Sequence, residues 1–127
     1  MKTSQALADH RLIYALDTFQ IYTGPIPETA DDPPTGTLLC EMTGCKLRYD
    51  VWSTAWELVS GPWEGAILES GRAAYCRHTS SVRPQLVTQG VVAKGFGGDL
   101  TVSNDEFHKG QVFKLHWLTV RVNASEK

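Results

Sequence analysis

The fold is decided by the stretch Phe19-Gln-Ile-Tyr-Thr-Gly-Pro-Ile-Pro-Glu-Thr-Ala-Asp-Asp-Pro-Pro-Thr-Gly-Thr-Leu-Leu-Cys-Glu-Met-Thr43. Phe19, Ile21 and Thr23 alternate with their neighbours at the period of a strand that has one buried face. Leu38–Thr43 is a second β-prone run. The four prolines between the two runs lack the N–H group that the interior of a sheet needs. The stretch therefore predicts a strand, a stiff extended connector and a second strand.

Further short strands separated by turns are expected in the rest of the chain. These are Lys46–Trp52, Trp56–Val59, Ala66–Leu68, Ala73–His78, Leu86–Ala93, Asp99–Ser103 and Gln111–Val122. The last is the longest, and its apolar phase changes at Trp117–Leu118, where either a β-bulge or burial on both faces would account for the change. Regularly spaced strands predict an all-β fold, an antiparallel β-sandwich or a jelly-roll-like barrel.

The chain is expected to form a single domain over residues 1–127. Its length is sufficient to bury a core without disulfides or a metal. Ser4–Leu16 is the one helix candidate, with Ser4 as its cap. Alternatively, residues 1–16 are an arm that packs on a neighbouring subunit. Residues 17–122 are expected to form the β core and residues 123–127 a tail.

Composition limits the classes of partner. The net charge of −2 argues against a nucleic-acid surface, because phosphate binding needs a concentrated basic patch. No apolar run approaches the roughly 20 residues that a membrane-spanning helix needs, and we expect no signal peptide. The odd number of cysteines, three, favours a reducing cytosol with buried thiols.

The ionisable residues show no spacing that is typical of a catalytic or metal site. Cys40, Cys45, Cys76 and His78 can be drawn as zinc ligands, but the first spacing lies at the loose edge of the known range, so buried thiols are favoured. The chain has neither a nucleophile-elbow motif nor a zinc-protease motif. We therefore predict a protein that is not an enzyme and that holds neither a metal nor a cofactor.

Two sets of residues are expected to contact a partner. The connector contributes Pro25, Pro27, Asp31, Asp32, Pro33 and Pro34, and the region after it contributes Trp52, Trp56 and Trp63. A stiff loop loses little entropy on docking, and its acidic residues are expected to be solvated rather than to hold calcium. Tryptophans can pack in a core or anchor a protein interface. If at least two were exposed and coplanar, they would instead suit a carbohydrate-binding module.

Several segments resemble a family of short virion structural proteins of tailed bacteriophages. The resemblance rests on Gln20–Gly24, Pro27, Thr35–Leu39 and Met42–Thr43, and it continues in order through Gly71–Arg77, Gln89–Val92, Gly98–Val102 and Gly110–Phe113. It covers most of Phe19–Val120. It implies a virion component made in the bacterial cytosol, whose partners are the major capsid protein, other virion proteins or further copies of itself.

The expected role within the particle is that of a capsid decoration or cement protein that stabilises the mature head. A ring component of the collar, neck or tail is the alternative, and a carbohydrate-binding module is a more distant one. Neither nucleic acid nor a membrane is expected as a partner.

Overall fold

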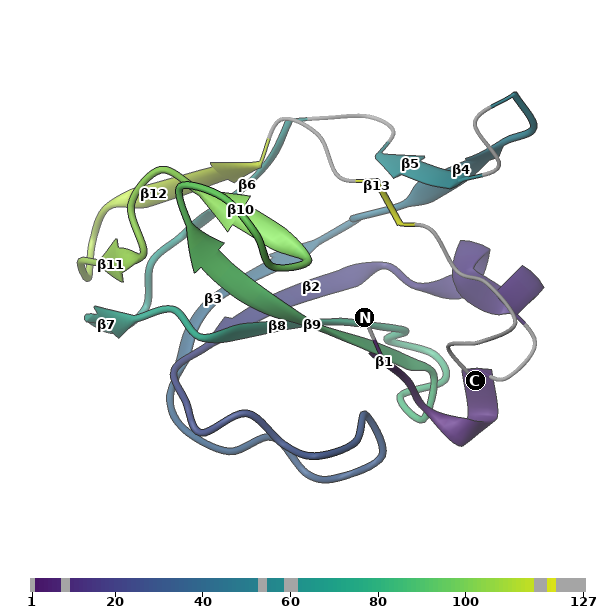
Figure 1. The fold of residues 1–127 in the computed structure, drawn as a ribbon, viewed down its shortest axis with the longest axis horizontal. Coiled ribbons are helices and arrows are strands. Elements are labelled where there is room, and N and C mark those ends of the chain that lie inside the picture. Colours follow the sequence, from purple (N-terminus) through teal and green to yellow (C-terminus); the bar gives the residue numbers. More distant parts are fainter. Residues whose placement is uncertain (1, 8–9, 53–54, 59–61, 116–118, 121–127) are drawn as a thin grey trace.

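The structure is a computed structural model, and it describes residues 2–7, 10–52, 55–58, 62–115 and 119–120. Its central sheet has six strands in the order β1-β9-β8-β2-β3, with β10 beside β9 (Figure 1). The strands are β1 (Lys2–Thr3), β2 (Thr18–Tyr22), β3 (Leu38–Thr43), β8 (Tyr75–Thr79), β9 (Val87–Lys94) and β10 (Leu100–Val102). Only the β9–β10 pair is parallel among these described strands. The antiparallel β2–β3 pair confirms the two strands predicted from residues 19–43.

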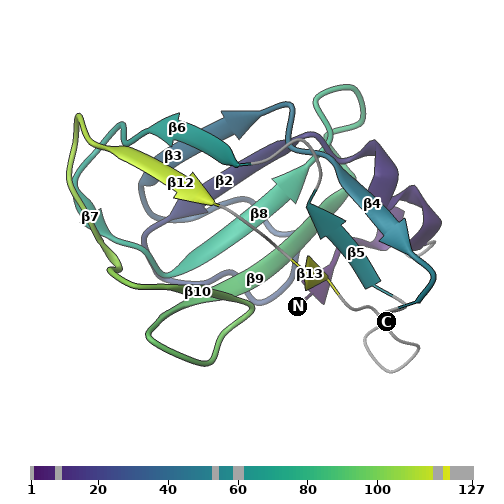
Figure 2. The same cartoon turned by 90° about the horizontal axis from the view of Figure 1, so that it is seen from above.

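Smaller sheets cover one face of the central sheet (Figures 1 and 2). One pairs β6 (Trp63–Ala66) with β12 (Val112–Leu115), and another places β5 (Ala55–Leu58) between β4 (Leu47–Asp50) and β13 (Thr119–Val120). A third, which pairs β7 (Gly71–Arg72) with β11 (Glu106–Phe107), lies at one end of the molecule (Figure 1). The core lies between the layers. The all-β, mostly antiparallel sandwich is confirmed, and the jelly-roll arrangement stays a prediction.

The central sheet continues into the second layer through β3. Cys40 on β3 forms an antiparallel bridge with Ile67, the residue after β6. The N–H of Leu68 donates to the carbonyl of Leu39 at 2.7 Å. Neighbouring strands therefore form one curved series, β10-β9-β8-β2-β3-β6-β12, whose first and last members are β10 and β12.

The N-terminal segment differs from the predicted helix. It forms strand β1 and two 3-10 helices, η1 (Gln5–Leu7) and η2 (His10–Ala15). Ser4 does not cap an α-helix, because its Oγ donates to Gln85 O at 2.8 Å and accepts from Val87 N at 3.0 Å. Leu7, Ile13 and Leu16 of this segment are buried in this domain's own core, and the arm on a neighbouring subunit stays a prediction. The β structure thus begins before residue 17. No helix in the described ranges is long and apolar enough to cross a membrane.

Two further expectations need correction. The strand placed at Ala66–Leu68 lies earlier, at Trp63–Ala66, because it starts directly after the turn-forming Pro62 and alternates Trp63 inward with Glu64 outward. The longest strand in the described part of the chain is β9, with eight residues, and the segment predicted as one long final strand contains β12 and β13. The phase change at Trp117–Leu118 and the tail at 123–127 lie outside the described residues.

Candidate binding surfaces

The connector between β2 and β3 lies on the side of the central sheet opposite β6 and β12 (Figure 1). It is held there by Arg77, which is only 4% exposed. Arg77 Nη2 donates to Asp32 O at 2.7 Å and to Thr29 O at 3.3 Å, and Nε donates to Gln89 Oε1 at 2.9 Å. Gln89 Nε2 in turn donates to Pro27 O at 2.8 Å. Three connector carbonyls are thus fixed to the sheet by two side chains.

A tyrosine holds the far end of the connector. Tyr75 Oη accepts from Thr35 N at 2.9 Å and donates to Thr35 O at 2.7 Å, and its ring stacks on Tyr22 with centroids 5.0 Å apart. Within the connector, Asp32 N donates to Thr29 O at 3.3 Å and closes a turn. The connector therefore contains a turn at residues 29–32. The connector folds back because the buried guanidinium and the tyrosine draw its carbonyls onto the sheet.

The connector residues predicted to contact a partner fall into three groups. Pro27 is buried against the sheet. The acidic side chains are exposed but have partners within the chain, because Asp31 Oδ2 accepts from Gln5 N at 3.0 Å and Asp32 Oδ2 accepts from Thr29 N at 3.1 Å. The outward-facing prolines are Pro25, Pro33 and Pro34. These three prolines are exposed, as a contact with a partner requires.

The sequence patterns considered above missed Arg77, Gln89 and Tyr75. Arg77 and Gln89 lie opposite each other in the β8–β9 ladder, on the face that the connector covers. The available signal was a charged residue in the middle of a short strand, next to Tyr75 and Cys76. Such a residue needs hydrogen-bond partners when it is buried, and a proline-rich segment has carbonyls without internal partners to offer.

The three tryptophans are divided between the surface and the core. Trp52 follows β4 and is 93% exposed, and its backbone N–H donates to Asp50 Oδ1 at 3.0 Å. Trp56 on β5 is half-buried and meets Tyr49 edge-on, at an interplanar angle of 64°. Trp63 on β6 is 4% exposed. The prediction of Trp63 as a surface contact is therefore wrong. The three do not provide the two exposed, coplanar rings that a carbohydrate platform needs.

The core encloses His78 and all three thiols, which confirms the expectation of buried cysteines. His78 Nε2 lies 2.6 Å from the carbonyl oxygen of Cys45, and because a carbonyl only accepts, Nε2 carries the hydrogen. Burial lowers the pKa of His78 to about 4. Burial also raises the pKa of Cys76 to about 12, so this side chain is a neutral thiol at physiological pH. Among the described residues, no group of three or more His, Cys, Asp or Glu side chains is placed to hold a metal.

A cleft of about 540 Å³ lies between β10 and β12. Residues 101–104, 106 and 107 form one side, residues 111–115 form the other, and Ile67 also contributes. Phe107 and Phe113 supply much of its apolar lining and stack with ring centroids 5.1 Å apart. The volume lies within the range of roughly 300–1,000 Å³ that is typical of ligand sites. We call this feature the β10–β12 cleft.

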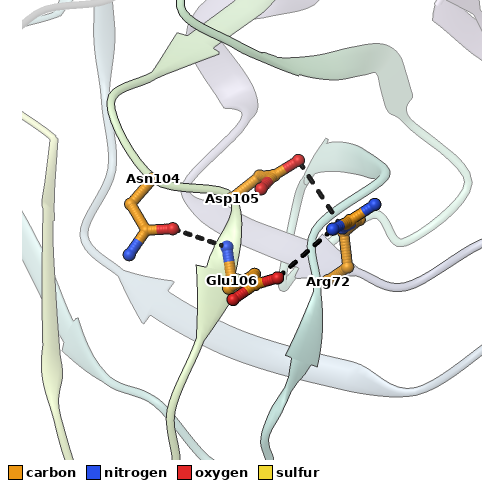
Figure 3. Close-up of polar contacts among 4 residues, drawn as sticks. All are labelled: Arg72, Asn104, Asp105 and Glu106. Atoms are coloured by element: carbon orange, nitrogen blue, oxygen red, sulfur yellow. Dashed lines mark hydrogen bonds and ion pairs between the residues drawn. The ribbon is translucent and has the colours of Figure 1, made fainter.

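Polar contacts fix the segment that forms one end of the cleft (Figure 3). Arg72 on β7 pairs with Glu106 (Nη2 to Oε1, 3.2 Å) and with Asp105 (Nε to Oδ2, 3.9 Å). The Glu106 N–H donates to Asn104 Oδ1 at 3.0 Å. These contacts join β7 to residues 104–106. This end of the cleft is thereby attached to β7.

Comparison of the chain with protein-family models, with curated proteins and with solved structures gives no match.

Proposed function

We propose that this chain is a non-enzymatic structural protein of a tailed-phage particle, and that it binds outside the mature capsid shell as a decoration or cement protein. Its partner is then the major capsid protein or another virion protein. The proposal draws on the resemblance of residues 19–120 to short virion structural proteins and on one surface feature of the fold.

That feature is the exposed apolar pair Val51–Trp52. Trp52 is 93% exposed, and Val51 beside it is 70% exposed. Tryptophan is among the residues most often found to dominate binding energy at protein interfaces. The backbone at Trp52 is held by its hydrogen bond to Asp50, so docking would order little more than one side chain. A shell with many copies of a partner would allow a modest anchor of this kind to suffice.

The direct test is quantitative mass spectrometry of purified particles, with the chain normalised to the major capsid protein. Abundance close to that of the capsid protein supports the decoration role. Abundance lower by one to two orders of magnitude supports the alternative, a ring at the collar, neck or tail. Absence of the chain from clean particles overturns the structural assignment.

The anchor is tested by co-sedimentation of the purified protein with particles that lack it. Trp52→Ala should weaken binding by at least about tenfold, because an anchoring tryptophan commonly contributes more than the corresponding free energy. Phe96→Ala is the matched control, since Phe96 is 89% exposed and lies in the β9–β10 connection, away from β4 and β5 in Figures 1 and 2. Equal losses for the two variants would count against a specific anchor at Trp52.

The connector is tested with Pro33→Ser/Pro34→Ser. This change is preferable to replacing all of residues 31–34, because Asp31 and Asp32 have partners inside the domain. Weaker co-sedimentation with an unchanged unfolding midpoint would assign the outward prolines to the interface. Unchanged binding would remove them from it.

A further inference from the structure

Strand β10 has one hydrogen-bonding edge with no partner in the described part of the chain. The carbonyl of Val102 accepts from Gly95 N at 2.9 Å, so the backbone groups of Val102 point toward β9 and its turn. Because N–H and C=O groups alternate sides along a strand, those of Thr101 point away from β9. Thr101 lines the β10–β12 cleft.

Strand β12 presents a second edge of the same kind. The carbonyl of Gln111 accepts from Ile67 N at 2.7 Å, and Phe113 and Leu115 lie opposite Gly65 and Trp63 of β6. The same alternation directs the backbone groups of Val112 and Lys114 away from β6. Both residues line the cleft. The described strands therefore place an unpaired edge on each side of it.

The space between the edges has a mixed chemical character. Its lining is apolar at Phe107, Phe113 and Leu115, and its two sides carry the backbone donors and acceptors of Thr101, Val112 and Lys114. An extended peptide has the matching pattern, because its backbone groups alternate to both sides while every second side chain faces one surface. A compact small molecule cannot satisfy two backbone edges along their length.

We infer that the β10–β12 cleft binds an extended segment of a different protein, which adds as a strand between β10 and β12. The steps β9–β8, β8–β2, β2–β3, β3–β6 and β6–β12 are all antiparallel, and β10 is parallel to β9. Strands β10 and β12 therefore run in opposite directions. The inserted segment is antiparallel to one of them and parallel to the other, with apolar side chains at alternate positions toward Phe107 and Phe113.

This inference is independent of the proposed place in a phage particle, since it depends only on the two edges and the lining. The test begins with selection from a displayed random dodecapeptide library on the immobilised full-length protein. Enriched peptides are synthesised with a fluorescent label, and their affinity for the protein in solution is measured by anisotropy.

Proline variants then block each edge. Thr101→Pro and Lys114→Pro remove an N–H that points into the cleft and leave the ladders to β9 and β6 unchanged. Thr101→Val is the matched control for Thr101→Pro. It keeps the backbone N–H and, like the proline variant, loses the hydrogen bond from Thr101 Oγ1 to Gly97 O. Lys114→Ala is the control for Lys114→Pro. It keeps the backbone N–H and, like the proline variant, loses the ion pair with Glu64. Thermal unfolding confirms that each variant is folded.

The expected result is that each proline weakens peptide binding by at least about tenfold, whereas each control changes it by less than about threefold. N-methylation of alternate amides in the best peptide gives the same answer on the unaltered protein, and it replaces the variants if a proline prevents folding. The inference is overturned if no peptide is enriched, if the prolines or N-methyl groups have no effect, or if proline and control act equally. It is also overturned if sedimentation shows self-association that both prolines abolish, since a second copy would then occupy the cleft.

Discussion

At the scale of single residues, His78 is the clearest case of a side chain whose ionisation the fold opposes. Its ring is enclosed by Phe19 and Trp63, with centroids 5.7 and 5.6 Å away. Burial is the main reason why its pKa falls from 6.5 to about 4. The hydrogen bond to the Cys45 carbonyl and the charge of Asp17 raise the pKa by less, and the charge of Lys46 lowers it slightly. Between these two pH values the unfolded chain binds a proton that the folded chain does not bind.

Stability should therefore fall as the pH drops from about 6.5 toward about 4, with a slope of up to about 1.4 kcal/mol per pH unit from this residue. Urea unfolding near pH 7, 6 and 5 measures the slope. His78→Gln should reduce it, and His108→Gln, which changes an exposed histidine, is the control variant. Asp17 acts at lower pH. Burial raises its pKa, but hydrogen bonds from Ser81 and Thr18 and the charge of Lys46 together outweigh burial and lower the pKa below 3.8. Identical slopes in the parent protein and in both histidine variants would contradict the assignment of the slope to His78.

At the scale of elements, the connector depends on Arg77 more than on its own prolines. Arg77→Met leaves Asp32 O, Thr29 O and the Gln89 side chain without their donor in a part-buried setting. We expect a loss of roughly 2–4 kcal/mol in the free energy of unfolding, because buried carbonyls and a bond from a charged donor are both affected. Chemical denaturation measures this loss, and limited proteolysis should show faster cleavage within residues 25–34.

Arg72→Met is the matched control for Arg77→Met. Its side chain is 70% exposed, and its ion pairs with Glu106 and Asp105 lie at the surface. Such pairs contribute about 0–1 kcal/mol, so the variant should unfold close to the parent. If both arginine variants lost equal stability, the connector would not be anchored as described.

The sequence predicted elements well where local pattern and burial agree. Strands β2 and β3 follow directly from the alternation in residues 19–23 and the β-prone run at 38–43. The helix at Ser4–Leu16 failed because the apolar residues in this segment meet the core by 3-10 turns, whose bonds include Leu7 N to Ser4 O at 3.0 Å. Trp63 was misplaced because residues 60–65 have the composition of a turn and were interpreted as one, although β6 begins at Trp63. Sequence composition cannot show where a turn ends and a strand begins when the residues on both sides of that boundary are common in turns.

At the scale of the whole molecule, the pattern predicted an all-β sandwich but not which strands would be neighbours. The β10–β12 cleft joins residues that pattern analysis places in separate turns and strands. It exists because β3 bridges to the end of β6 and bends the sheet into the second layer. That bend depends on close packing, such as Gly65, where an added Cβ would lie 2.8 Å from Met42 Cγ. Contacts between distant segments carry no local signature.

Trp63 connects the two layers and gives the test at this scale. It lies on β6 and packs against Phe19 of β2, 5.8 Å between centroids, and His78 of β8. Trp63→Ala should cost roughly 3–5 kcal/mol, because it leaves a cavity where the layers meet. Trp52→Ala should change stability by no more than about 0.5 kcal/mol, since its side chain has almost no packing to lose. Far-ultraviolet circular dichroism follows unfolding of both variants without relying on tryptophan emission. Similar stabilities for the two would mean that the layers are held together elsewhere, for example through the β3–β6 bridge alone.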